Sequence, residues 1–144
     1  MTYIPKYFKI EEVMPPDLCD PSDPNQWFFF DDRILITGDR LREHYGPMVC
    51  NTWWHGGSHS LRGYRSWATK VGSQYSQHKF GRALDLIPTV AEVEDIRQDI
   101  IANPTREMFE YIMAIETGVP WLHIDCRNYS KARNGLLLFG KPDR

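Results

Sequence analysis

The spacing of apolar residues predicts one well-defined helix in the first third of the chain. Asp31 is a suitable cap for a helix that runs to about Tyr45, because Ile34, Leu35 and Leu41 can form an apolar stripe along it. The Gly-Pro pair that follows is a typical stop signal. We therefore expect this segment to lay an apolar face on the core.

Two further helices are expected in the second half of the chain. The first covers about residues 90–102. The second opens at the Asn-Pro pair of residues 103–104, with proline at the first helical position, and runs to about Glu116. Gly118 and Pro120 would end it, so Glu116 is predicted to lie at the end of a helix.

Four short segments have the composition and alternation of strands: residues 48–54, 82–87, 121–126 and 136–139. Strands and helices are interspersed without a regular βαβ rhythm. This order predicts an α+β fold, with a small antiparallel or mixed sheet and helices packed on one face. A chain of 144 residues suits one domain covering residues 1–144.

Composition narrows the classes of partner. The net charge of −2 gives no basic footprint for nucleic acid, and no apolar run approaches the roughly 20 residues that cross a membrane. The first nine residues lack the apolar core of a signal peptide, so we expect a chain made in the cytoplasm. We also expect it to be a monomer.

The chemically informative segment is residues 76–85, SQHKFGRALD. A tight turn at Gly81 would let the following strand run back past His78, so that Asp85 points toward the imidazole. Ala83 shares the strand face of Asp85, and its small side chain leaves room for an ion.

A second segment, residues 121–126 (WLHIDC), supplies another histidine. On a strand, His123 and Asp125 share one face, while Leu122 and Ile124 face the core. Two histidines and one carboxylate are the ligand set of a catalytic zinc with an open position for water. The three cysteines form no C-x-x-C pair, so a structural cysteine-rich site is not indicated.

Each of these residues also has a plainer interpretation. His78, Asp85 and His123 taken singly are more typical of structural positions, and only their joint spacing favours a metal site. His44 suits a helix C-terminus. His55 and His59 lie in a Gly/Ser loop and could line the pocket, although solvated loop positions are their plainer interpretation.

The two segments together resemble a known family. Residues 76–85 match S-x-H-x-x-G-x-A-x-D, residues 121–123 match W-x-H, and residues 63–66 (GYRS) resemble S-G-Y-R-S with Arg62 in place of the first serine. These are signatures of the zinc D-Ala-D-Ala metallopeptidases, which include D,D-carboxypeptidases and phage endolysins and share a hedgehog-like fold.

The resemblance implies one Zn²⁺ per chain, held by His78, Asp85 and His123. It implies Arg65 as the group that polarises the substrate or grips its carboxylate, and Ser76 as a substrate-binding or loop-holding residue. The implied substrates are peptidoglycan stem peptides, either as a carboxypeptidase or as an endopeptidase. The implied place of action is the cell wall, in phage lysis or as a virion component.

The general base is where the chain departs from the family. Many relatives have an acid three residues before the second zinc histidine, but here that position is Pro120. Glu116 is the nearest acid upstream and is our candidate base; Asp125 is the reserve candidate, or else a partner that orients a zinc-bound histidine. The same departure keeps an alternative open: a catalytically silent zinc-binding module of this fold.

Overall fold

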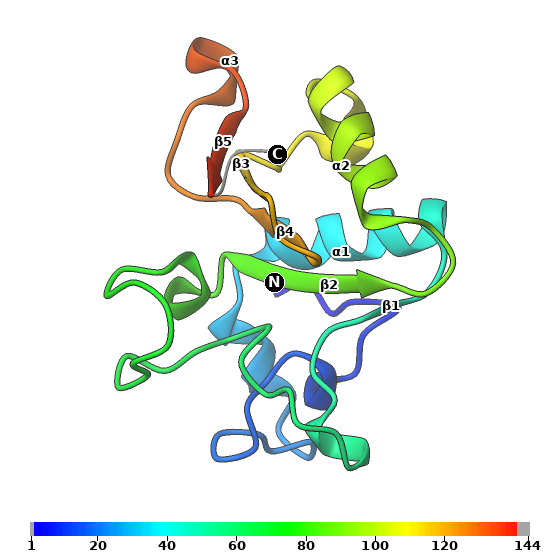
Figure 1. Cartoon of the computed structure of the whole chain (residues 1–144). Helices are drawn as coiled ribbons and strands as arrows, with labels where there is room; N and C mark the ends of the chain where they lie inside the picture. Colours follow the sequence, from blue (N-terminus) through cyan, green and yellow to red (C-terminus); the bar gives the residue numbers. More distant parts are fainter. Residues whose placement is uncertain (1, 141–144) are drawn as a thin grey trace.

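The computed structural model describes residues 2–140 and has an α+β fold built on a five-stranded mixed sheet (Figure 1). The strand order is β1-β2-β4-β3-β5. The strands are β1 (Met48–Val49), β2 (Ala83–Pro88), β3 (Ala114–Thr117), β4 (Leu122–Asp125) and β5 (Leu137–Gly140). The α-helices are α1 (Asp32–Tyr45), α2 (Val93–Ala102) and α3 (Lys131–Asn134). The predicted fold class is therefore confirmed.

The centre of the sheet is the antiparallel pair β2 and β4. Its register sets Asp85 opposite His123 and Ala83 opposite Asp125. β3 runs antiparallel to β4, and β5 pairs with β3 in parallel. Residues that lie directly opposite each other on neighbouring strands point their side chains to the same face, so Asp85 and His123 share one face of the sheet.

Helix α1 begins where the sequence predicts. The Asp31 carboxylate accepts a hydrogen bond from the Arg33 backbone N–H, which satisfies one of the free donors of the first turn. Gly38 faces the sheet so closely that an added Cβ would lie 3.3 Å from a methyl group of Leu84. Leu84 and Asp85 are neighbours on β2 and point to opposite faces of the sheet. Helix α1 therefore packs on the face opposite Asp85 and His123.

The core joins that face of the sheet to the helices. The apolar side chains of β2 and β4 form a single buried cluster with those of α1 and α2: Leu84, Leu86, Leu122, Ile124, Ile34, Leu35, Leu41, Ile96 and Ile100. The central strands are thus anchored from one side by the hydrophobic core. Their other side is left to carry polar chemistry.

The helix predicted for residues 104–116 is wrong. This segment instead forms a 3₁₀ turn, Glu107–Phe109, followed by strand β3. The apolar run at residues 112–115 fits either period, and pairing with β4 and β5 decides in favour of a strand. Glu116 consequently lies on a strand rather than at a helix end.

The strand predicted for residues 48–54 is shorter than expected. It ends at Val49, and a 3₁₀ turn occupies Trp53–His55. The side chains of Asn51 and Trp53 both donate to the carbonyl of Met14, at 3.1 and 2.8 Å, which draws this segment away from the sheet.

Within residues 2–140, no helix combines the length and apolar character needed to cross a membrane. The three cysteines, all in this part of the chain, are free thiols.

Candidate metal centre

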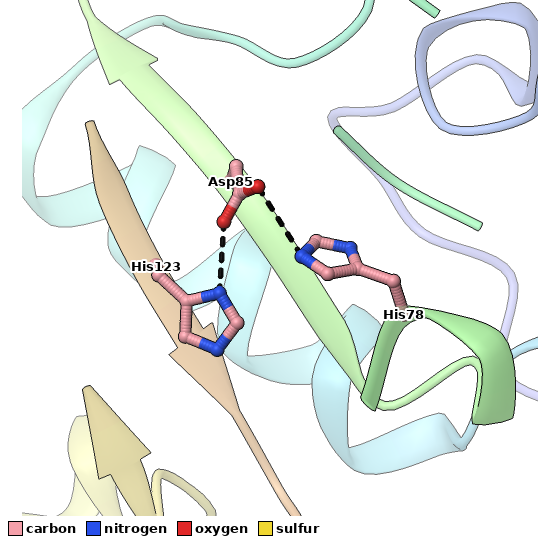
Figure 2. A group of neighbouring side chains, drawn as sticks. All are labelled: His78, Asp85 and His123. Atoms are coloured by element: carbon pink, nitrogen blue, oxygen red, sulfur yellow. Dashed lines mark hydrogen bonds and ion pairs between the residues drawn. The ribbon is translucent and has the colours of Figure 1, made fainter. Parts of the chain in front are cut away.

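Three buried side chains from three separate elements converge at the centre of the sheet (Figure 2). His78 comes from the 3₁₀ helix Gln77–Phe80, Asp85 from β2 and His123 from β4. One ligand atom of each lies within 4.8 Å of those of the other two. The group is able to hold a metal ion, as the two motifs predict.

The loop that carries His78 is fixed at both ends. The Ser76 hydroxyl caps the 3₁₀ helix by accepting from the His78 backbone N–H. Gly81 ends the helix at φ 66°, and a Cβ there would lie 1.8 Å from the carbonyl oxygen of Phe29. Only glycine fits this turn, which sends the chain from the His78 loop directly into β2.

The orientation of the His78 ring follows from its hydrogen bonds. Its Nδ1 lies 2.8 Å from the Gly63 carbonyl oxygen, which can only accept, so Nδ1 carries the proton. Its Nε2 then presents a lone pair to the Asp85 carboxylate, 3.2 Å away. With His78 neutral, its Nε2 lone pair and the Asp85 carboxylate are two acceptors that face each other and repel. A cation bound between them would remove this repulsion.

His123 is oriented in the same manner from the opposite side. Its Nε2 donates to the Asp125 carboxylate at 2.7 Å, and its Nδ1 faces the other oxygen of Asp85 at 2.8 Å. Asp125 is fully buried and also accepts two hydrogen bonds from the Arg127 guanidinium, at 2.8 and 2.6 Å. A carboxylate behind a ligating histidine is a common device in metal sites, because it fixes the ring and its tautomer.

The two histidines of the metal group differ in their tendency to bind a proton. Burial lowers the pKa of His78. Burial also opposes protonation of His123, but hydrogen bonds to Asp125 and Asp85 outweigh it and raise the pKa of His123 to about 9. Burial would raise the pKa of Asp85, yet the hydrogen bond from protonated His123 holds it well below its usual range. In the metal-free protein a proton on His123 thus partly compensates the buried carboxylate.

These donors fit a divalent ion. Two imidazole nitrogens and a carboxylate oxygen offer three lone pairs toward one point, and both rings have their second nitrogen occupied elsewhere. A set of this kind leaves coordination positions for water or substrate.

A cavity of about 550 Å³ opens beside the three side chains, and we call it the main cavity. The residues predicted for catalysis and substrate binding, Arg65, Ser76 and Glu116, all line it. The structure therefore brings them to the same site as the metal group, although their roles stay predictions.

Glu116 reaches this cavity from β3, next to the strand that carries His123. Its carboxylate accepts a hydrogen bond from the indole N–H of Trp121 at 3.3 Å. The turn between the two strands brings these two residues together, so Glu116 reaches the cavity from a strand position.

Asp125, the reserve candidate for the base, does not line the main cavity. Its side chain is 0% exposed, and its oxygens accept from His123 and Arg127. Its geometry suits orientation of His123 rather than proton transfer to a substrate.

Arg65 lies beside the metal group, next to Asp85 in the wall of the main cavity. Its guanidinium Nη2 is 3.6 Å from Asp85 Oδ2, and its Nε donates to the Leu61 carbonyl at 2.7 Å. Burial lowers its pKa, which the charge of Asp85 opposes. Arg65 thus keeps a positive charge at the wall of the cavity.

Sequence reasoning missed Arg97, on α2. This side chain, 2% exposed as a residue, donates to the carbonyls of Glu116, Val119 and Trp121 at 3.1, 2.9 and 2.8 Å, and it pairs with Glu94. It therefore holds the end of β3, which carries Glu116, together with the turn that follows. An isolated arginine in a helix gives no signal of such a role, because the three carbonyls belong to another element.

The remaining histidines, His44, His55 and His59, are not part of the metal group. His44 and His55 are exposed, and neither lines the main cavity. His59 is exposed as well but lines a smaller neighbouring cavity.

No protein-family model, no curated protein and no solved structure matches the chain. The family resemblance therefore depends on the short motifs alone.

Proposed function

We propose that this protein is a zinc-dependent peptidase that hydrolyses peptide bonds in the stem peptides of peptidoglycan. The observation that carries the proposal is the shared geometry of His78 and His123. Each ring has one nitrogen committed to an oxygen acceptor and directs the other toward Asp85. This arrangement supports a site of three protein ligands with open positions, which is typical of catalytic rather than structural zinc.

A bound zinc ion would supply a Lewis acid that activates water and polarises a carbonyl. Glu116 is the group that takes the proton of the attacking water and later returns one to the leaving amine. The Trp121 indole supports this role, since its hydrogen bond orients the Glu116 carboxylate within the cavity. Arg65 stabilises negative charge that develops on the substrate, because its charge lies at the wall of the same cavity.

The substrate class rests on the motifs of residues 76–85 and 121–123, together with the size of the site. A cavity of about 550 Å³ accommodates a few peptide residues. The resemblance to D-Ala-D-Ala peptidases and phage endolysins then points to the peptides of the bacterial cell wall.

The experiment combines metal content with peptide cleavage. Purified protein should contain about one zinc per chain, measured by elemental mass spectrometry, and should release free amino groups from purified peptidoglycan or synthetic stem peptides. His78→Ala should lose both properties, whereas His44→Ala, at an exposed position away from the site, should keep both.

The outcomes separate the candidates. Zinc without cleavage of any wall peptide would make the protein the catalytically silent module. Absence of zinc, together with unchanged behaviour of His78→Ala, would end the metallopeptidase proposal.

A further inference from the structure

A second cavity, of about 360 Å³, lies against the metal group, and we call it the side cavity. It is lined by residues 58–62 and shares Arg65, Val71, Asp85 and Trp121 with the main cavity. The two cavities are therefore neighbours, with Asp85 in the wall of both. A peptide that crosses the metal group has room on both sides of the bond to be cut.

The two cavities differ in charge. The main cavity has paired charges, since Arg127 is bonded to Asp125 and the Glu116 carboxylate lies nearby. The side cavity contains Arg62 and Arg65, but Asp85 is the one acid among its lining residues. With Asp85 committed to the histidines and the metal, the side cavity retains positive charge.

Arg62 is the residue that gives the side cavity this character. Within residues 2–140, no carboxylate lies within 4.0 Å of its guanidinium. In the described part of the chain, the guanidinium makes one hydrogen bond to protein, from Nη1 to the Cys50 carbonyl at 3.2 Å. The remaining donors of the planar fork stay available, and a carboxylate is the partner that this fork matches best.

The backbone of Arg62 is also held next to the metal group. Its backbone carbonyl accepts from the Asp85 N–H at 2.8 Å, and its backbone N–H donates to Asn51 Oδ1 at 3.0 Å. The next residue, Gly63, supplies the carbonyl that orients His78. A carboxylate bound by the Arg62 side chain would thus lie near the bond at the metal, where its binding helps to position the substrate.

We propose that Arg62 recognises a substrate carboxylate next to the scissile bond, so that the side cavity is an acidic-residue subsite. This proposal rests on the proposed peptidase function and specifies its substrate. Arg62 also stands where the resembled segment has serine, so the preference is expected to be particular to this chain.

The test uses three synthetic stem pentapeptides: one with free carboxylates at the second residue and at the C-terminus, and two in which one or the other is amidated. Binding to the zinc-loaded protein is measured by calorimetry, and cleavage by chromatography. One of the two amidations should weaken binding or kcat/KM by roughly ten- to hundred-fold, as expected for loss of a charged hydrogen bond. Arg62→Gln should bind and cut the free and the amidated peptide equally, and Arg62→Lys should recover part of the preference.

The control is Arg133→Gln, which removes an exposed arginine from α3. It should leave the preference intact. Zinc content and thermal unfolding of both glutamine variants should match the wild type. An unchanged preference in Arg62→Gln, or a wild type that ignores both amidations, would overturn the subsite. Binding that discriminates without any cleavage would instead retain the subsite and reject the peptidase.

Discussion

The metal group is assembled from two regions that are stabilised in different ways. Asp85, His123 and Glu116 lie on neighbouring strands, anchored from beneath by the hydrophobic core. His78 and Arg65 lie in the irregular segment between β1 and β2, which extends to one side of the sheet (Figure 1). We call these the strand half and the loop half of the site.

The two halves orient their histidines with different partners. The strand half uses a charged side chain, Asp125, behind His123, whereas the loop half uses the backbone carbonyl of Gly63 behind His78. A carboxylate raises the basicity of the ring that it contacts, while a carbonyl mainly fixes its tautomer. The strand half therefore combines metal ligation with a proton equilibrium, and the loop half supplies a neutral ligand.

The largest expected effect is the loss of either histidine. His78→Ala and His123→Ala should both abolish stoichiometric zinc binding and all cleavage, because only two of the three protein ligands remain.

The stabilities of the two metal-free variants should differ. His123→Ala should cost about 3–5 kcal/mol, since it leaves two buried carboxylates without their shared partner. His78→Ala should cost about 1–3 kcal/mol, the range for one lost buried hydrogen-bond donor. Urea unfolding with a chelator measures both, and equal losses would remove the distinction between the halves.

Glu116→Gln should give the next largest effect. The amide keeps the shape and can still contact Trp121, but it cannot take a proton. We expect kcat to fall roughly 10²–10⁴-fold with zinc content unchanged. Glu110→Gln, at an exposed glutamate, is the matched control. Wild-type turnover in Glu116→Gln would assign proton transfer to another group.

Asp125→Asn tests the orienting carboxylate of the strand half. The amide can accept from only one oxygen, so His123 loses its charged partner and the bond pattern with Arg127 changes. Zinc affinity, measured by chelator competition, should fall roughly 10- to 100-fold. A change of less than twofold would mean that Asp125 serves the fold and not the metal.

The affinity for zinc should also depend on pH through His123. Because the pKa of His123 is raised to about 9 in the metal-free protein, zinc must displace a proton at neutral pH. Affinity should therefore rise about tenfold per pH unit from about pH 7 toward pH 9, with about one proton released per ion. His78, whose pKa is lowered, should release none. Calorimetry in buffers of different ionisation enthalpy counts the protons.

The same equilibrium sets the stability of the metal-free protein, and its sign is fixed. The folded pKa of about 9 exceeds the ordinary value of about 6.5, so the protonated ring stabilises the fold fully below pH 6.5. That contribution disappears as the pH rises through 9. Saturating zinc should abolish this trend, because His123 then ligates the ion.

Ser76→Ala should have the smallest effect. It removes the cap of the short helix that carries His78, which is worth about 1 kcal/mol. We expect zinc affinity to fall by up to about tenfold. In the zinc-saturated protein, kcat should stay at the wild-type value. A large drop in kcat at saturating zinc would instead support contact between Ser76 and the substrate.

The sequence predicted the parts of the molecule that depend on local pattern. The capped helix from Asp31, the turn at Gly81 and the alternation of residues 121–126 each follow from nearby residues, and the structure confirms them. The two motifs likewise sufficed to bring His78, Asp85 and His123 together.

The remainder depends on contacts between distant segments. Residues 114–117 form a strand because β4 and β5 offer partners on both sides, which no local period reveals. The side chain of Arg97 and the carbonyl of Gly63 act on elements far along the chain. The sequence therefore allowed Glu116 to be proposed as a residue of the site, but it predicted Glu116 at the end of a helix rather than on strand β3.

Anomalous diffraction at the zinc edge, from crystals of the zinc-loaded protein, shows whether the three side chains bind one ion together. We predict one peak at about 2.0–2.2 Å from three atoms: His78 Nε2, His123 Nδ1 and an oxygen of Asp85. A zinc peak elsewhere, ligation through the opposite nitrogen of either ring, or no peak at this group would exclude His78, Asp85 and His123 as the zinc ligands in this geometry.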